Sequence, residues 1–128
     1  MPADTARAED IVQINDTVSR VAYVLDAHDY DRMGEVFAHD VHFENPGRLV
    51  ADGLAELIKA FQGIASPAVS HHITNVLVTD YDGTHANCVM KALTLRTGGV
   101  ITSAEYRDTL RKDPEGWRIT SRVITPLG

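Results

Sequence analysis

The sequence predicts an α+β fold in which helices of the first half cover one side of a curved antiparallel sheet. Two patterns predict it: apolar residues recur at helical spacing before about residue 65, and alternating runs separated by turn signals dominate from about residue 70. The chain of 128 residues is 44% hydrophobic and 23% charged, which is typical of one globular domain. We therefore expect a single domain over residues 1–128, with residues 1–6 as a loose leader.

Three helices are expected in the first half of the chain. The first runs from about residue 7 to 28, and one stripe of its surface carries Ile11, Ile14, Val18, Val21 and Leu25. The second is short, over residues 29–38. The third follows Asp52-Gly53 and continues to about residue 64, because large apolar residues recur there at helical spacing. Between the second and third helices, residues 41–45 alternate and end at Pro46-Gly47, which predicts a short strand and a turn.

Four longer strands are expected after residue 70. They cover residues 71–80, 86–96, 102–112 and 117–124, with turns at 81–84, 98–99 and 113–116. The strand over 86–96 is apolar on both faces, with Cys88, Met90 and Ala92 on one and Val89, Leu93 and Leu95 on the other. Such a strand needs a cover on both faces, and the helices supply only one. We therefore expect a homodimer that forms through the outer face of the sheet.

Charge and cysteine content exclude several classes of function. A net charge of −6 argues against nucleic acid or an anionic membrane as the main partner. The lone cysteine, Cys88, excludes an internal disulfide, and its apolar strand favours a buried structural thiol over a nucleophile. No apolar run resembles a signal peptide or a membrane span, so we expect a cytoplasmic protein.

Asp26 and the pair His71-His72 are the candidate catalytic residues. Asp26 lies about 110° from the centre of the apolar stripe of the first helix, at the flank of the core. It could serve in general acid–base chemistry, or it could simply hydrogen-bond a neighbour. His71 and His72 are adjacent on a strand and point to opposite faces, so only one of them can line a pocket.

If His71 lines the pocket, Ile73, Asn75 and Leu77 share its face and form an apolar wall with one polar group, while His72 packs elsewhere or lies at an interface. Two tyrosines have two open interpretations each. Tyr23 either faces the mouth of the pocket as a phenol donor or covers the helix surface. Tyr106 is either a pocket-lining phenol or an ordinary sheet aromatic.

The remaining polar candidates favour structural roles. His39 and His42 have a spacing seen in metal sites, but no third ligand is near in sequence, so no metal is expected. Arg122 is interpreted first as a structural residue that could pair with Glu44, Glu105 or Asp108, and second as an anion-binding residue.

The order and spacing of five segments resemble the SnoaL-like branch of the nuclear transport factor 2-like superfamily. These segments are Tyr23-Val24-Leu25-Asp26-Ala27-His28-Asp29-Tyr30-Asp31, Val36-Phe37-Ala38-His39-Asp40-Val41, His71-His72-Ile73-Thr74-Asn75, Tyr106-Arg107-Asp108-Thr109-Leu110 and Gly116-Trp117-Arg118-Ile119. The resemblance covers about residues 10–123. It implies a cone-shaped, cystatin-like roll in which three N-terminal helices close a bent sheet around a pocket.

The nearest functional patterns are similar to those of scytalone dehydratase and hexachlorocyclohexane dehydrochlorinase. The run from Asp26 to Asp31 resembles the dehydratase, and His71, four residues before Asn75, resembles the dehydrochlorinase. The resemblance implies a dyad in which His71 takes a proton from carbon and Asp26 orients it.

This resemblance favours a small cofactor-independent lyase, isomerase or cyclase that acts on an apolar molecule, of a dehydratase-like, polyketide or steroid type. Because one superfold hosts many functions, two alternatives stay open. One is a non-catalytic ligand carrier or accessory subunit, and the other is a small subunit like those of aromatic-ring dioxygenases.

Overall fold

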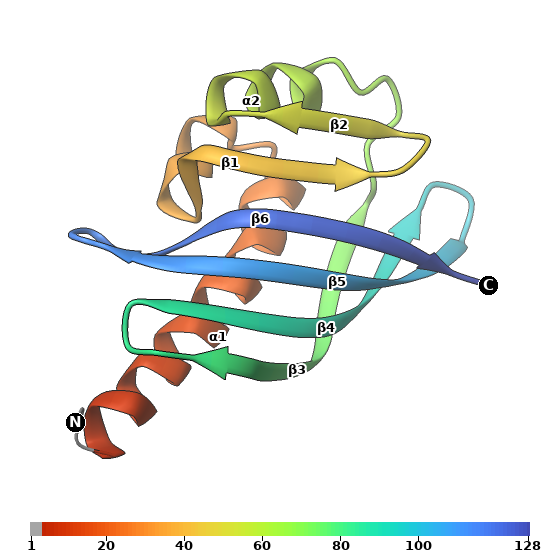
Figure 1. Cartoon of the computed structure of the whole chain (residues 1–128). Helices are drawn as coiled ribbons and strands as arrows, with labels where there is room; N and C mark the ends of the chain where they lie inside the picture. The colour runs from red at the N-terminus through yellow and green to blue at the C-terminus, as the bar shows by residue number, and fades with distance from the viewer. Residues whose placement is uncertain (1–3) are drawn as a thin grey trace.

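A six-stranded sheet with the strand order β2-β1-β6-β5-β4-β3 lies at the centre of the computed structural model, which describes residues 4–128 (Figure 1). Along the chain the elements are α1 (Asp4–Asp26), the 3-10 helix η1 (Tyr30–Glu35), β1 (Phe37–Asn45), β2 (Leu49–Asp52), α2 (Leu54–Gln62), β3 (Ser70–Tyr81), β4 (His85–Arg96), β5 (Val100–Asp113) and β6 (Gly116–Leu127). Neighbouring strands are antiparallel except β1 and β6, which are parallel. The predicted α+β class, with a curved sheet and helices, is confirmed.

Helix α1 packs its predicted apolar stripe against the sheet. Ile14 and Val18 are fully buried, and Val21 and Leu25 are buried beside them. The helix begins at Asp4, so residues 4–6 of the expected loose leader are helical, whereas residues 1–3 lie outside the described part of the chain.

The segment between α1 and α2 differs from the prediction in two respects. The expected helix over 29–38 is only a 3-10 helix that ends at Glu35, and β1 already begins at Phe37. Gly34 weakens a helix, and the carbonyl of Val36 accepts a hydrogen bond from the Ile119 N–H, which continues the chain into parallel pairing with β6. The short strand β2 was not predicted, although it completes a hairpin in which Leu49 pairs with Asn45.

Strand β4 shows the alternation that its sequence predicts. Its inward-facing side chains are buried, and they are Ala86, Cys88, Met90, Ala92 and Thr94. Burial raises the pKa of the Cys88 thiol to about 12, so this residue is an inert structural thiol.

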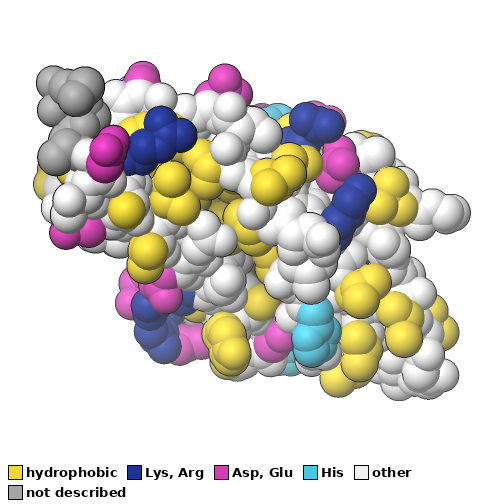
Figure 2. All heavy atoms as spheres, turned by 90° about the horizontal axis from the view of Figure 1, so that it is seen from below, with side chains coloured by type: hydrophobic (Ala, Val, Ile, Leu, Met, Phe, Trp, Pro, Cys, Tyr) yellow, Lys and Arg dark blue, Asp and Glu magenta, His cyan; other side chains and the backbone are white. Residues whose placement is uncertain are grey.

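The outer face of the sheet keeps apolar side chains in contact with solvent. Leu93 is 43% exposed and Leu95 is 37% exposed on β4, and Ile101, which pairs with Leu95, is 63% exposed on β5. Exposed apolar side chains also occur elsewhere, and Figure 2 shows several of them among charged residues on the face seen from below.

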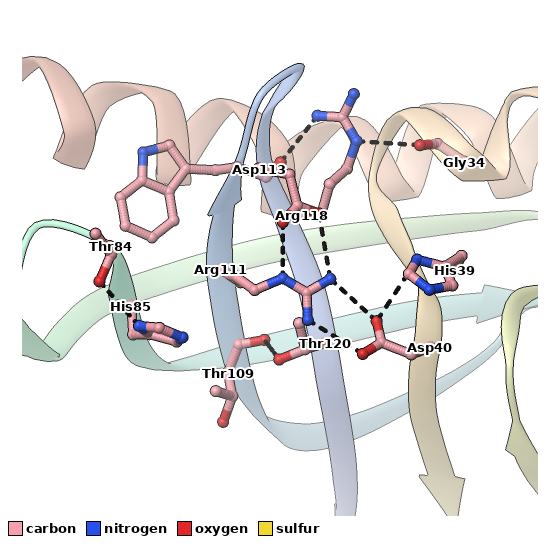
Figure 3. Close-up of polar contacts among 11 residues, drawn as sticks. Gly34, His39, Asp40, Thr84, His85, Thr109, Arg111, Asp113, Arg118 and Thr120 are labelled. Carbon is pink, nitrogen blue, oxygen red and sulfur yellow. Dashed lines mark hydrogen bonds and ion pairs between the residues drawn. The ribbon is translucent and has the colours of Figure 1, made fainter.

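Ion pairs fix one end of the sheet, where β1, β5 and β6 meet (Figure 3). The guanidinium of Arg111 donates to Asp40 at 3.1 Å and to Asp113 at 2.7 Å. These carboxylates, Asp113 first and then Asp40, raise the pKa of Arg111. Close by, Arg118 Nε donates to the carbonyl of Gly34 at 3.0 Å and ties β6 to η1.

None of the helices within residues 4–128 combines the length and the apolar character needed to cross a membrane.

Candidate active site

A cavity of about 550 Å³ lies between the inner face of the sheet, the end of α1, and the β1–β2 hairpin with α2. Its aromatic wall is built by Tyr30, Phe43 and Phe61, since the Phe61 ring stacks on Tyr30 at 6.3 Å and meets Phe43 edge-on at 5.6 Å. The lining residues come from the end of α1, η1, the β1–β2 hairpin, the end of α2 with the segment after it, and strands β3 to β6. They are Val21, Ala22, Leu25, Tyr30, Phe43, Asn45, Gly47, Arg48, Leu49, Phe61, Ile64, Ser66, Pro67, Ala68, His71, Ile73, Thr94, Arg96, Thr102, Ser103, Ala104, Tyr106, Arg122, Ile124 and Pro126.

Asp26 and His71 are in direct contact at the edge of this cavity. His71 Nδ1 lies 2.7 Å from Asp26 Oδ1, and the backbone N–H of His71 donates to Asp26 Oδ2 at 3.0 Å. Because a carboxylate only accepts hydrogen bonds, the contact places the proton of the neutral imidazole on Nδ1. The lone pair of Nε2 then remains available to a molecule in the cavity.

The local structure on both sides fixes this pair. Helix α1 ends in a Schellman motif, in which the His28 N–H donates to Leu25 and the Asp29 N–H donates to Val24, with His28 at a φ of +54°. Asp26 is therefore held in the last turn of α1. His71 follows the first residue of the edge strand β3, and Asp26 accepts a backbone N–H that has no partner strand on that side.

His72 points away from the cavity, as strand alternation requires. It is exposed, and its Nε2 lies 3.0 Å from the hydroxyl of Ser70. Ile73, in phase with His71, lines the cavity.

The expectation that Asn75 and Leu77 share the pocket face of His71 is wrong. The pairing of β3 with β4 shifts between Thr74 and Leu77, and Asn75 has a φ of +56°. This bulge adds one residue and reverses the alternation, so Val76 faces inward and Leu77 is 64% exposed. Asn75 is consequently exposed to solvent and does not line the cavity.

Of the two tyrosines, Tyr106 lines the cavity and Tyr23 does not. Tyr23 is 78% exposed, because it lies on the face of α1 that points away from the sheet. The prediction that it faces the pocket mouth is therefore wrong, and its other interpretation, a residue on the helix surface, applies.

Arg122, which lines the cavity, forms a buried ion pair with Asp108. Its Nε and Nη2 donate to the two oxygens of Asp108 at 2.8 and 2.7 Å, and its guanidinium lies 4.7 Å from the centre of the Tyr106 ring. Burial disfavours the charge on Arg122, but the Asp108 carboxylate outweighs it, so the pKa of Arg122 is raised. Asp108 is one of the three partners that the sequence analysis named.

A buried acid of α1, Asp10, was not recognised from the sequence. It accepts hydrogen bonds from the Trp117 indole at 3.0 Å, from Lys112 at 2.9 Å and from the Tyr81 hydroxyl. Burial alone would raise the pKa of Asp10, but these three donors lower it below its usual value. The available signal was spacing, because Asp10 precedes Ile14 by four residues and so continues the buried stripe.

Two further cavity residues, Arg48 and Arg96, were also missed. Arg96 is the last member of the inward row of β4, two residues after Thr94, so alternation could have found it. Arg48 lies in the turn between β1 and β2, and no pattern identified it.

The histidines at 39 and 42 do not share a site. Both ring nitrogens of His42 contact carboxylates, Asp52 at 2.6 Å and Glu44 at 3.3 Å, whereas the His39 side chain is 86% exposed. Asp52 first and then Glu44 raise the pKa of His42. Within residues 4–128, no three His, Cys, Asp or Glu side chains converge in a way that could hold a metal ion.

Comparison with known proteins identifies one domain model and many related structures. A model of the SnoaL-like domain matches residues 6–123. No curated protein matches the chain.

Three solved structures illustrate the structural relationship. An NTF2-like protein with a cystatin-like fold from Novosphingobium aromaticivorans superposes with a TM-score of 0.86 at 23% identity, covering 98% of this chain and 86% of that one. A provisionally assigned scytalone dehydratase from the same species has a TM-score of 0.81 at 20% identity, with coverages of 98% and 89%. A hexachlorocyclohexane dehydrochlorinase from Novosphingobium barchaimii has a TM-score of 0.83 at 16% identity, with coverages of 98% and 95%. At these identities the similarity shows a shared fold.

Proposed function

Because the chain belongs to the SnoaL-like domain family, we propose that it is a small enzyme that removes a proton from carbon by general base catalysis. The observation that carries the proposal is the contact of 2.7 Å between His71 and Asp26 at the edge of a largely apolar cavity. The dehydratase and dehydrochlorinase structures that share this fold support the same hypothesis.

In the proposed mechanism, His71 Nε2 takes a proton from a carbon next to an activating group, and the electron pair stays on the substrate. Asp26 holds the Nδ1–H and stabilises the imidazolium that forms. The electron pair then expels a leaving group, moves a double bond or closes a ring, which makes the enzyme a lyase, an isomerase or a cyclase. The chain's own residues supply this chemistry, and none of these steps requires a cofactor.

Proton removal can be tested before the natural reaction is known. We would incubate the protein in D₂O with 1-indanone and 1-tetralone, which have activated C–H bonds, and follow loss of the proton signal by NMR. The wild type should accelerate exchange, and His71→Ala should abolish the acceleration. His72→Ala is the matched control and should stay within about threefold of wild type, because its side chain points away from the cavity.

The runner-up function is a ligand carrier or an accessory subunit, because an apolar cavity binds small molecules with or without chemistry. Saturable binding of these ketones without any exchange would favour it. Exchange that survives His71→Ala would contradict the general base role.

We also propose that the protein is a homodimer through the outer sheet face. Leu93, Leu95 and Ile101 form a solvent-exposed apolar group there. Leu95→Glu should convert a dimer into monomers in analytical ultracentrifugation, and a wild-type monomer at micromolar concentration would contradict this proposal.

A further inference from the structure

The charges around the cavity do not match the charge of the chain. The cavity is lined by Arg48, Arg96, Arg122 and His71, and among residues 4–128 no Asp or Glu belongs to the lining. The whole chain nevertheless has a net charge of −6. An acidic protein that gathers cations around one cavity creates a local potential that attracts anions.

Two of these four cationic or ionisable groups are already paired with a carboxylate. Asp26 contacts His71, and Asp108 forms a bidentate pair with Arg122. The other two differ, because within residues 4–128 no carboxylate lies within ion-pair distance of Arg48 or Arg96. Arg48 is exposed on the β1–β2 turn, where water can solvate its charge.

Arg96 is in a less favourable position. Its Nε is the one buried side-chain nitrogen or oxygen in the described residues that has no hydrogen-bond partner. A buried donor on a charged group without an acceptor is unfavourable, and native proteins rarely leave one. Arg96 also ends the inward row of β4, so its side chain borders the cavity and not the outer face. A ligand oxygen can supply the missing acceptor.

The position of Arg96 relative to His71 sets the geometry of such a ligand. His71 pairs with Thr94 across β3 and β4, and Arg96 lies two residues further along β4. At the rise of a β-strand this offset is about 7 Å along the cavity wall. A ring system could therefore place its reacting carbon at His71 while a charged group reaches Arg96.

Building on the proposed function, we infer that the substrate is amphipathic, with an apolar ring body and an anionic oxygen group, such as a carboxylate, that Arg96 binds. Guanidinium groups bind such groups by charge-assisted and often bidentate hydrogen bonds. The aromatic wall holds the apolar body, and Arg48 at the rim adds attraction as the ligand enters. Arg96 is thus a specificity-determining residue, and it takes no part in proton transfer.

The test uses two fluorescent probes that differ in one charged group. 8-Anilinonaphthalene-1-sulfonate carries a sulfonate, and N-phenyl-1-naphthylamine is the same ring system without it. Arg96→Gln should weaken binding of the sulfonate probe about tenfold or more, as expected for loss of hydrogen bonds to a charged group. Binding of the neutral probe should change less than about twofold, because the ring contacts with the aromatic wall remain.

Arg107→Gln is the matched control. It removes the same charge from the neighbouring strand, but the Arg107 side chain is 67% exposed and pairs with Glu105 on the outer side. Both probes should bind this variant as they bind wild type. Amide chemical shifts should show that the sulfonate probe perturbs His71, Thr94 and Arg96 in the wild-type protein.

The inference would be overturned by equal loss of both probes in Arg96→Gln, by no loss of the sulfonate probe, or by shifts centred outside the cavity. None of them bears on proton transfer, which His71→Ala tests by deuterium exchange. In His71→Gln the selective effect of Arg96→Gln should persist. Loss of that selectivity would show that the histidine, and not Arg96, recognises the anion.

Discussion

Two of the acids of helix α1, Asp10 near its start and Asp26 at its end, bind residues of the sheet, but in different ways. Asp10 is 4% exposed and accepts hydrogen bonds from three side chains, those of Tyr81, Lys112 and Trp117. Within residues 4–128, the side-chain hydrogen bonds of Asp26 go to one residue, His71, through its ring and its backbone, and the Asp26 side chain is 24% exposed. Asp10 is enclosed by hydrogen-bond donors. Asp26 instead holds the imidazole of His71, whose Nε2 remains available to the cavity.

This difference separates a structural acid from a catalytic candidate. Each donor around Asp10 is used to attach α1 to β3, β5 and β6, and within the described residues nothing there adjoins the main cavity. The contact of Asp26 with His71 Nδ1 leaves His71 Nε2 available to accept a proton, as a general base requires. The comparison predicts that the two acids contribute to different measurable properties, namely stability for Asp10 and activity for Asp26.

The largest effect on stability should come from Asp10→Ala. Removal of this carboxylate leaves the Trp117 indole and the Tyr81 hydroxyl without an acceptor, at a cost of about 3 kcal/mol in the free energy of unfolding. Urea denaturation measures it. Asp16→Ala on the same helix is the control, because Asp16 forms only an exposed pair with Arg20 and should cost less than about 0.5 kcal/mol. Equal losses in the two variants would show that Asp10 stabilises the fold no more than an exposed acid does.

Asp10 should also make the free energy of unfolding decrease at low pH. The pKa of Asp10 is lowered in the folded protein, so the unfolded chain binds its proton first as the pH falls. The stabilisation is present above about pH 4, near the pKa of an unfolded aspartate, and is lost as the pH falls through the lower folded value. The stability gap between wild type and Asp10→Asn should therefore shrink below pH 4. A gap that stays constant from pH 6 to pH 3 would contradict this assignment.

By contrast, Asp26→Asn should change the free energy of unfolding by less than about 1 kcal/mol. The amide oxygen can still accept a hydrogen bond, and the site is partly solvated. Thermal and urea unfolding test this point. A loss as large as that of Asp10→Ala would show that Asp26 is mainly a structural residue.

The smallest effect concerns the β1–β2 hairpin. Asp52 and Glu44 raise the pKa of His42 above its usual 6.5, so the stability from this contact is fully present below about pH 6.5. It is lost as the pH rises through the higher folded value. Since His42 and its partners are exposed, the gap between wild type and His42→Gln should be below about 1 kcal/mol at pH 6 and smaller at pH 9. A larger gap at pH 9 would reverse the assigned sign.

The elements that the sequence predicted well are those with a long, regular pattern. The stripe from Ile14 to Leu25 and the alternation of β4 each span enough residues for one face to be identified. The contact of Asp26 with His71 was expected from resemblance alone, because 45 residues separate them and no local pattern joins them.

The features that sequence reasoning missed depend on single residues. The bulge at Asn75 reverses the alternation of β3 without any glycine or proline to mark it. The burial of Asp10 depends on three donors that come from distant strands, and the missing partner of Arg96 is visible only once the cavity is assembled. Local propensity does not contain such long-range information.

In the proposed mechanism Asp26 and His71 act as one catalytic unit, which a double-mutant cycle measured by deuterium exchange can test. Asp26→Asn and His71→Gln should each lower the exchange rate by about 10²–10⁴-fold. The double variant should lose no more than about threefold beyond the worse single variant, because either change disables the same pair. If the two losses multiply, or if Asp26→Asn retains the wild-type rate, the two residues do not act as one unit and the proposed mechanism is wrong.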